Sequence, residues 1–185
     1  MQVKPGGARP SDTPIGKNKE NDLYKRILVP VDGSDTSTRA LVAALQMARE
    51  SGGAVRIVHV IEELAQVIAY DPYGAYPGDL SKIMHDSGQK ILAEAMGVAQ
   101  AAGVSAEQQL IEASGQRLAE VVIADALRYK ADLIVVGTHG RRGLGRVLLG
   151  SGAEQIIRQA PIPVLVIRAA ELAHGHAGEQ PVSTP

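Results

Sequence analysis

Residues 27–34 read ILVPVDGS, an apolar run that stops abruptly at Asp32, Gly33 and Ser34. An unbroken apolar run bounded by turn-forming residues is typical of a strand that is buried on both faces. Residues 132–136, DLIVV, repeat the pattern. Together the two segments predict a parallel sheet with helices packed against both of its faces.

Helix and strand patterns alternate on either side of these two segments. Apolar residues at helical spacing predict helices at 36–50, 80–102, 116–129 and 152–159, and strands are expected at 55–61, 106–112 and 163–167. The segment 62–79 is rich in glycine and proline and is expected to be a loop. Because strands that alternate with helices form right-handed crossovers, the prediction is a single-domain, three-layer α/β/α sandwich with a five-stranded, mostly parallel, Rossmann-like sheet.

The composition fits one globular domain with tails. The chain has 185 residues, of which 45% are hydrophobic and 21% are charged. We expect residues 1–22 to form a disordered N-terminal arm, residues 23–169 the domain, and residues 170–185 a flexible C-terminal tail.

Several classes of protein are disfavoured by the same composition. No segment approaches the ~18 continuous apolar residues of a membrane span, and the N-terminus has no apolar signal region. The chain lacks cysteine, tryptophan and phenylalanine, and its formal net charge is −1. These features predict a cytoplasmic location and neither redox chemistry nor nucleic-acid or membrane partners.

Residues 137–151, GTHGRRGLGRVLLGS, form the segment with the most chemical character. Glycines let backbone N–H groups approach an anion, arginines favour phosphate, and the segment ends at a predicted helix N-terminus. The sequence contains neither a Walker loop nor the G-x-G-x-x-G pattern of dinucleotide-binding folds. Glycines after a strand can also serve turns alone, and Ser151 with Glu154 has the form of a capping box. Asp32 and Gly137 both follow strongly apolar strands, so they would share one crevice if those strands are neighbours.

Gly137, Gly140, Gly150 and Ser151 fill the pattern G-x2-G-x9-G-[ST], which resembles the ATP-binding signature of the universal stress protein family. Residues 27–34, the pair His59-Val60 and residues 160–167 are similar to that family as well. The likeness covers roughly residues 24–168.

The resemblance implies strand order 3-2-1-4-5, homodimers built through the last strand (163–167), and a regulatory role in stress survival. It also implies a bound adenine nucleotide, either ATP or AMP/ADP, with or without Mg²⁺. Residues near the adenine and ribose would be Pro30, Val31, Asp32, Val60, Val136 and Gly137. Residues near the phosphates would be His139, Gly140, Arg141, Gly150, Ser151 and Gly152.

Some of these roles have alternatives. Asp32 could cap the following helix or bind magnesium, although Ser34 fits the cap better and would leave Asp32 for the ligand. His139 could act as an acid or base, or be structural. Arg141, like Arg142 and Arg146, could contact phosphate or be solvated. Gly152 stands where relatives often have Val or Thr, which would loosen the helix start.

Three functions are compatible with the pattern. The first is a binding module that needs no catalytic residue and no protein-bound metal. The second is a slow ATPase or nucleotidyl-transfer enzyme, and it ranks lower because residues 31–35 supply neither a serine-rich phosphate loop nor paired histidines. The third is a dimeric scaffold with an empty site, against which the intact glycine pattern argues.

Replacing Gly140 by aspartate is expected to abolish nucleotide binding and to leave the fold intact. The new side chain and its negative charge would occupy the position of a phosphate. Calorimetric titration of Gly140→Asp with ATP measures the effect, and normal binding by this variant would show that the site is wrongly assigned.

Overall fold

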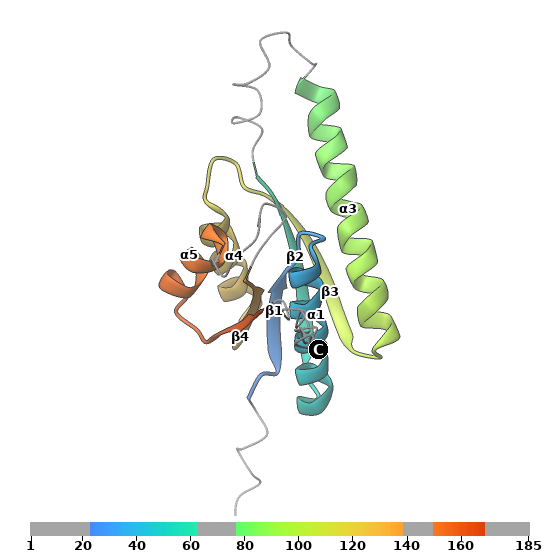
Figure 1. Cartoon of the computed structure of the whole chain (residues 1–185), viewed down its shortest axis with the longest axis vertical. Coiled ribbons are helices and arrows are strands. Elements are labelled where there is room, and N and C mark those ends of the chain that lie inside the picture. The colour runs from blue at the N-terminus through green and yellow to red at the C-terminus, as the bar shows by residue number, and fades with distance from the viewer. Residues whose placement is uncertain (1–22, 63–76, 139–149, 169–185) are drawn as a thin grey trace, which may run out of the picture.

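The computed structural model describes residues 23–62, 77–138 and 150–168. A parallel sheet has the strand order β3-β2-β1-β4-β5, which confirms the expected order (Figure 1). Its strands are β1 (Arg26–Pro30), β2 (Ala54–Ile61), β3 (Ser105–Glu112), β4 (Leu133–Gly137) and β5 (Val164–Ile167).

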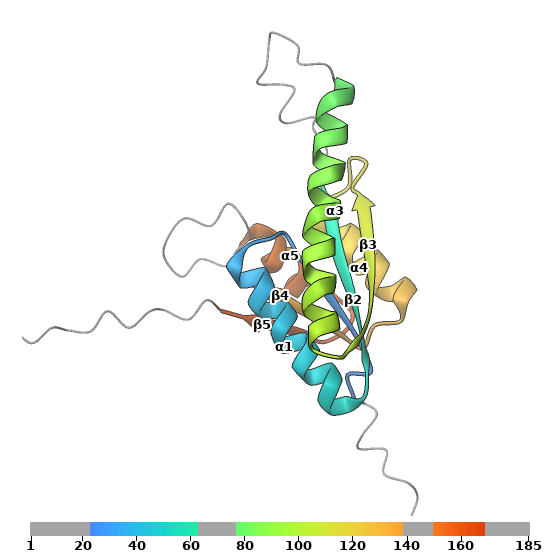
Figure 2. The same ribbon diagram turned by 90° about the vertical axis from the view of Figure 1, so that its right-hand side faces the viewer.

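Helices cover the sheet on both sides, as the three-layer prediction requires. Helices α1 (Asp35–Ser51) and α3 (Pro77–Ala101) lie on one face, and α4 (Leu118–Tyr129) and α5 (Ser151–Gln159) lie on the other (Figure 2). Helix α3 begins earlier than the predicted residue 80, since proline is well tolerated in the first turn of a helix. Its N-terminal part projects past the sheet at the end where the strands finish (Figures 1 and 2).

The ends of α1 follow the local sequence signals. Ser34 is the N-cap, and its hydroxyl oxygen accepts a hydrogen bond from the N–H of Ser37 at 3.2 Å. Gly52 ends the helix in the left-handed region with φ of 66°, a conformation that glycine adopts without steric cost. The expected cap at Ser34 is therefore confirmed.

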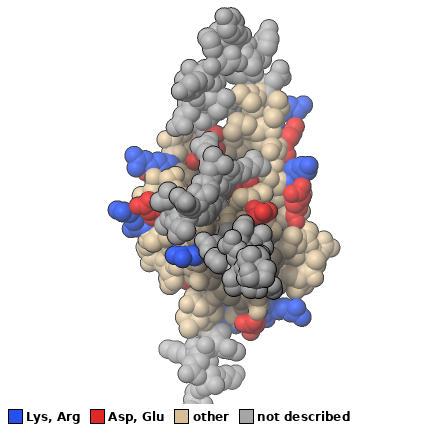
Figure 3. Space-filling view, viewed as in Figure 1, with Lys and Arg blue, Asp and Glu red and all other residues tan. Residues whose placement is uncertain are grey.

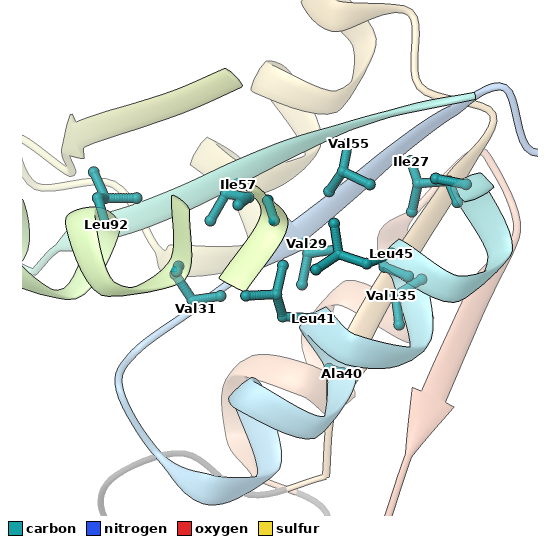
Figure 4. Close-up of a cluster of buried hydrophobic side chains, with 14 of the residues drawn as sticks. Ile27, Val29, Val31, Ala40, Leu41, Leu45, Val55, Ile57, Leu92 and Val135 are labelled. Carbon is teal, nitrogen blue, oxygen red and sulfur yellow. The ribbon is translucent and has the colours of Figure 1, made fainter. Parts of the chain in front are cut away.

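The two faces of the sheet build two separate cores. Successive residues of a strand point to opposite faces, so Ile27 and Val29 pack under α1 and α3 while Leu28 packs under α4. Figure 4 shows the first core, in which Leu41 and Leu45 of α1 lie against β1, β2 and β4. This alternation explains why β1 is apolar at every position after Arg26.

An ion pair between β2 and α4 lies beside the second core. Asp125 is 1% exposed, and its carboxylate accepts hydrogen bonds from Arg56 Nε at 2.6 Å and Nη2 at 3.1 Å. Glu107 accepts a further bond from Arg56 Nη1 at 3.1 Å. Burial opposes the charged form of Arg56, but these carboxylates outweigh it and raise the pKa of the guanidinium. The helical pattern leads one to expect apolar residues on the buried face of α4. It therefore gave no sign that Asp125 is buried there.

On the outer surface, basic and acidic side chains lie next to each other in small mixed groups on the side shown in Figure 3. Two exposed pairs lie along single helices, Lys90 with Glu94 at 4.0 Å and Arg158 with Glu154 at 3.1 Å. Such pairs contribute only about 0.3–0.5 kcal/mol each. Among the described helices, none combines the length and hydropathy that a bilayer crossing requires.

Leu41→Ala is expected to lower the free energy of unfolding by about 2–5 kcal/mol, because it leaves a cavity in the core under α1. The leucine side chain is 1% exposed, whereas its neighbour Val42 is 51% exposed. Val42→Ala is therefore the matched control, with an expected change within about 0.5 kcal/mol. Urea denaturation measures both values, and equal losses would contradict the packing described here.

Candidate functional site

The carboxyl ends of β1 and β4 lie side by side. Leu28 pairs with Ile134, so Val31 and Gly137, each three residues further along, lie at the ends of adjacent strands. Open parallel sheets bind ligands in the crevice beyond such strand ends. The expectation that Asp32 and Gly137 share one crevice depended on these strands being neighbours, and they are.

The turn after β1 is held by hydrogen bonds to its own side chains. Asp32 Oδ1 accepts from the N–H of Ser34 at 3.0 Å and from its hydroxyl at 2.6 Å, and the N–H of Asp32 donates to the hydroxyl of Ser37 at 3.3 Å. Ser34 is the cap of α1, as expected, and it also binds the Asp32 carboxylate. An aspartate readily bonds the backbone two residues on, so the same short segment forms both the turn and the cap. The carboxylate is partly exposed and fixed in direction.

Gly137 is required by packing between β4 and α1. A Cβ atom at this position would lie 2.8 Å from both the carbonyl carbon and the carbonyl oxygen of Thr36, at the start of α1. The end of β4 can approach the first turn of α1 only because no side chain stands between them.

The two residues that flank segment 139–149 are joined directly. The N–H of Gly150 donates to the carbonyl of Thr138 at 2.7 Å, and the N–H of Thr138 donates to the carbonyl of Ile167 at 2.9 Å. Thr138 and Gly150, the residues on either side of this segment, therefore lie together at the carboxyl end of β4. The N–H of Gly150 is already bonded to Thr138. In this structure Gly150 therefore serves to join the two residues that flank the segment.

Helix α5 starts differently from the prediction. Gly150 is the N-cap, its carbonyl accepts from the N–H of Glu154 at 2.9 Å, and Ser151 is the first helical residue. The prediction of a capping box formed by Ser151 and Glu154 is therefore wrong, since the cap residue has no side chain. Ser151 is exposed, and the first-turn N–H groups of a helix have no partner within the helix.

Gly152 packs against α4. A Cβ atom here would lie 2.5 Å from Leu118 Cδ2. The glycine lets α5 approach α4 closely, and the obstacle is the rotatable end of a side chain.

The three valines of the predicted site are buried on opposite faces of the sheet. Val60 and Val136 belong to the core under α4, and Val31 belongs to the core under α1 and α3. Pro30 is partly exposed at the end of β1. The three valine side chains are therefore almost fully covered by the two cores. The predicted residues His139, Gly140 and Arg141 lie outside the described residues, as do Arg142 and Arg146.

Two contacts in this region were missed from the sequence. The hydroxyl of Ser37 holds the Asp32 amide, and the ring of His59 is hydrogen-bonded to the Val31 carbonyl at 2.7 Å. The sequence marked His59 only as part of a family pattern. No local signal marks either contact, because each depends on how β2 or α1 is placed against the end of β1.

Two open hollows of about 490 and 500 Å³ flank α3 on the side of β3. The first is lined by His85, Gln89, Gln108 and Glu112, among others, and the second mainly by small and apolar residues from α3 to the start of β3. They follow the sheet edge and include none of the predicted site residues.

Residues 23–168 match the model of the universal stress protein family. The chain belongs to this family. It is similar to the universal stress protein MJ0531 of Methanocaldococcus jannaschii, with 35% identity over 159 residues that cover 83% of this chain and 87% of the relative.

Solved structures of the family have the same fold as this universal stress protein. One from Burkholderia pseudomallei is 32% identical, with a TM-score of 0.65 over 80% of this chain and 98% of that one. A universal stress protein from Archaeoglobus fulgidus in complex with dAMP is 25% identical, with a TM-score of 0.57 over 78% and 98% of the two chains. Another, in complex with cAMP, is 27% identical, with a TM-score of 0.56 over 79% and 98%.

Gly137→Ala is expected to destabilise this universal stress protein by about 1–3 kcal/mol, because a backbone carbonyl of α1 would have to move. Gly152→Ala is the comparison, since the Leu118 side chain can rotate away and alanine favours a helix. Thermal unfolding of the two variants measures the difference. A Gly137→Ala protein as stable as Gly152→Ala would show that the close approach to Thr36 is not a constraint.

Proposed function

We propose that the protein binds an adenine nucleotide, with ATP as the resident ligand, at the carboxyl ends of β1 and β4. The bound nucleotide would make it a regulatory module in the stress response. The main support is the paired arrangement of a fixed carboxylate at Asp32 and a helix N-terminus at Gly150, which follow neighbouring strands. Family relatives solved with dAMP and cAMP support the adenine class of ligand.

The adenosine half of the ligand would lie over the end of β1. An ionised carboxylate only accepts hydrogen bonds, so Asp32 suits the ribose hydroxyls. Its direction is already fixed by the two bonds from Ser34, which lowers the entropy cost of binding. Pro30, Val31, Val60, Val136 and Gly137 would form the apolar surroundings of the base and sugar.

The phosphate half would lie at the start of α5. The first-turn amides and the helix dipole favour an anion there, and Ser151 adds an exposed hydroxyl. Gly140 and Gly152 would allow close approach of the backbone, and His139 and Arg141 would approach the phosphates from the same segment. Gly150 would act through its anchoring bond to Thr138.

Of the adenine nucleotides, ATP fits the sequence pattern best, because the glycine segment contains three arginines and no acidic residue. AMP and ADP share the adenosine contacts, and Mg²⁺ would accompany ATP through the phosphate oxygens. Among the described residues, no group of three or more His, Cys, Asp or Glu side chains is arranged to hold a metal ion.

The hydrogen bonds made by Asp32 favour nucleotide binding over nucleotide hydrolysis or transfer. Its carboxylate oxygen is engaged by Ser34, which suits a fixed acceptor better than a group that must exchange a proton. Regulation would act through a homodimer formed by β5. This short edge strand has four partly exposed residues, so its outer edge can pair with a second copy.

Thermal unfolding with and without Mg-ATP tests the proposal, with AMP as a second adenine ligand and GTP as the control. A ligand at ~100 times its dissociation constant adds about 2.7 kcal/mol, which raises the melting temperature by several degrees. A rise with ATP and little change with GTP is expected. No rise with either nucleotide, on protein shown to contain no copurified nucleotide, would contradict the proposal.

Asp32→Asn is the matched variant for the site. Asparagine keeps an oxygen at Oδ1 for the two Ser34 bonds and removes the negative charge. The melting temperature without ligand is therefore expected to stay within a few degrees of wild type, while the rise with ATP is lost. An Asp32→Asn protein that responds to ATP like wild type would remove Asp32 from the site.

A further inference from the structure

Val31 is bound by two consecutive residues of β2. Its N–H donates to the carbonyl of Val58 at 2.8 Å, and its carbonyl accepts from the ring of His59 at 2.7 Å. The pairing of β1 with β2 ends one residue earlier, at Pro30 and Val58. Val31 is buried, so both of its backbone groups need partners inside the protein.

The contact defines the state of the imidazole. A carbonyl oxygen can only accept, so Nδ1 of His59 must carry a hydrogen. In the neutral ring this leaves Nε2 as the nitrogen without one. His59 is therefore specified as the Nδ1–H tautomer or as the charged form.

Helix α3 holds the other side of the ring. Gly88 is buried against β2 and β3, and a Cβ atom on it would lie 2.9 Å from His59 Cδ2 and 2.7 Å from Leu110 Cδ1. Real Cβ contacts are essentially never this short, so the helix backbone approaches the imidazole closely because residue 88 is glycine. Any side chain at position 88 would therefore press on the imidazole.

We propose that His59 is a positioning residue of the nucleotide site, an inference that rests on the function proposed above. Clamped between Gly88 and the Val31 carbonyl, it fixes the point at which the chain leaves β1. The next residue is Asp32, whose amide is held from the other side by Ser37. The direction of the Asp32 carboxylate therefore depends on contacts with both β2 and α1. A shift of α3 against the sheet would move the imidazole. The Val31 carbonyl and the Asp32 carboxylate would then move with it.

Two substitutions of similar size separate the hydrogen bond from the volume of the ring. In His59→Asn, the amide nitrogen of the new side chain stands the same number of bonds from the backbone as Nδ1 of the histidine, so this variant keeps a donor. His59→Leu leaves the Val31 carbonyl without that partner.

Isothermal titration with Mg-ATP is expected to show affinity about tenfold or more weaker for His59→Leu, and His59→Asn within about threefold of wild type. Circular dichroism melts confirm that each variant is folded.

A second pair of variants leaves the histidine unchanged. Gly88→Ala would push on the ring from α3, while Gly97→Ala lies on the same helix with nothing within 4 Å of its added Cβ. Both substitutions improve helix propensity by a similar amount. Weaker ATP binding is expected for Gly88→Ala alone, together with a changed ¹⁵N–¹H signal for the Asp32 amide.

The ring nitrogens of the wild-type protein give a test that needs no variant. A long-range ¹H–¹⁵N spectrum is expected to show a protonated Nδ1 on His59, and the Nε2–H tautomer would overturn the inference. Equal ATP affinity for His59→Leu and wild type, or for Gly88→Ala and Gly97→Ala, would also overturn it and leave the proposed function standing. Wild-type protein that binds no ATP would overturn the proposed function and the inference together.

Discussion

Strand β1 is paired along both edges and buried on both faces, and the rest of the structure is arranged around it. Its neighbours β2 and β4 fix which residues leave the sheet together, and helices on both faces exclude water from its side chains. The start of β1 is also fixed, because Asp132 accepts from the N–H groups of Lys25 at 2.8 Å and Arg26 at 3.1 Å. One aspartate thus ties the entry of β1 to the entry of β4.

The opposite end of β1 is where we propose that the nucleotide binds. When a strand ends between two neighbours, its chain has to turn away, and its backbone groups need new partners. Here the partners come from β2, from the hydroxyls at the start of α1, and from a histidine side chain. The result is a rigid turn beside a helix N-terminus. A site of this kind requires little reorganisation when a ligand arrives.

Glycine has several distinct roles around this crevice. Gly137 allows a strand to meet a helix start, Gly88 allows a helix to meet a ring, and Gly150 serves as a cap. At each of these positions the glycine serves a contact within the protein. A glycine pattern shared by a family can therefore reflect packing and ligand binding at the same time, and the two demands act on the same residues.

The sequence by itself determined the elements and their order. Apolar runs at 27–31 and 132–136 and helical spacing elsewhere locate strands and helices because burial is read directly from periodicity, and Ser34 and Gly52 mark helix ends through bonds to near neighbours. The family pattern supplied the sheet order and the candidate residues. Only the tertiary structure decided the contacts between distant residues. Arg56 and Asp125 are 69 positions apart, and Val31 and His59 are 28 apart. Such pairs depend on strand register and on how closely helices approach, and a single chain's periodicity does not encode either.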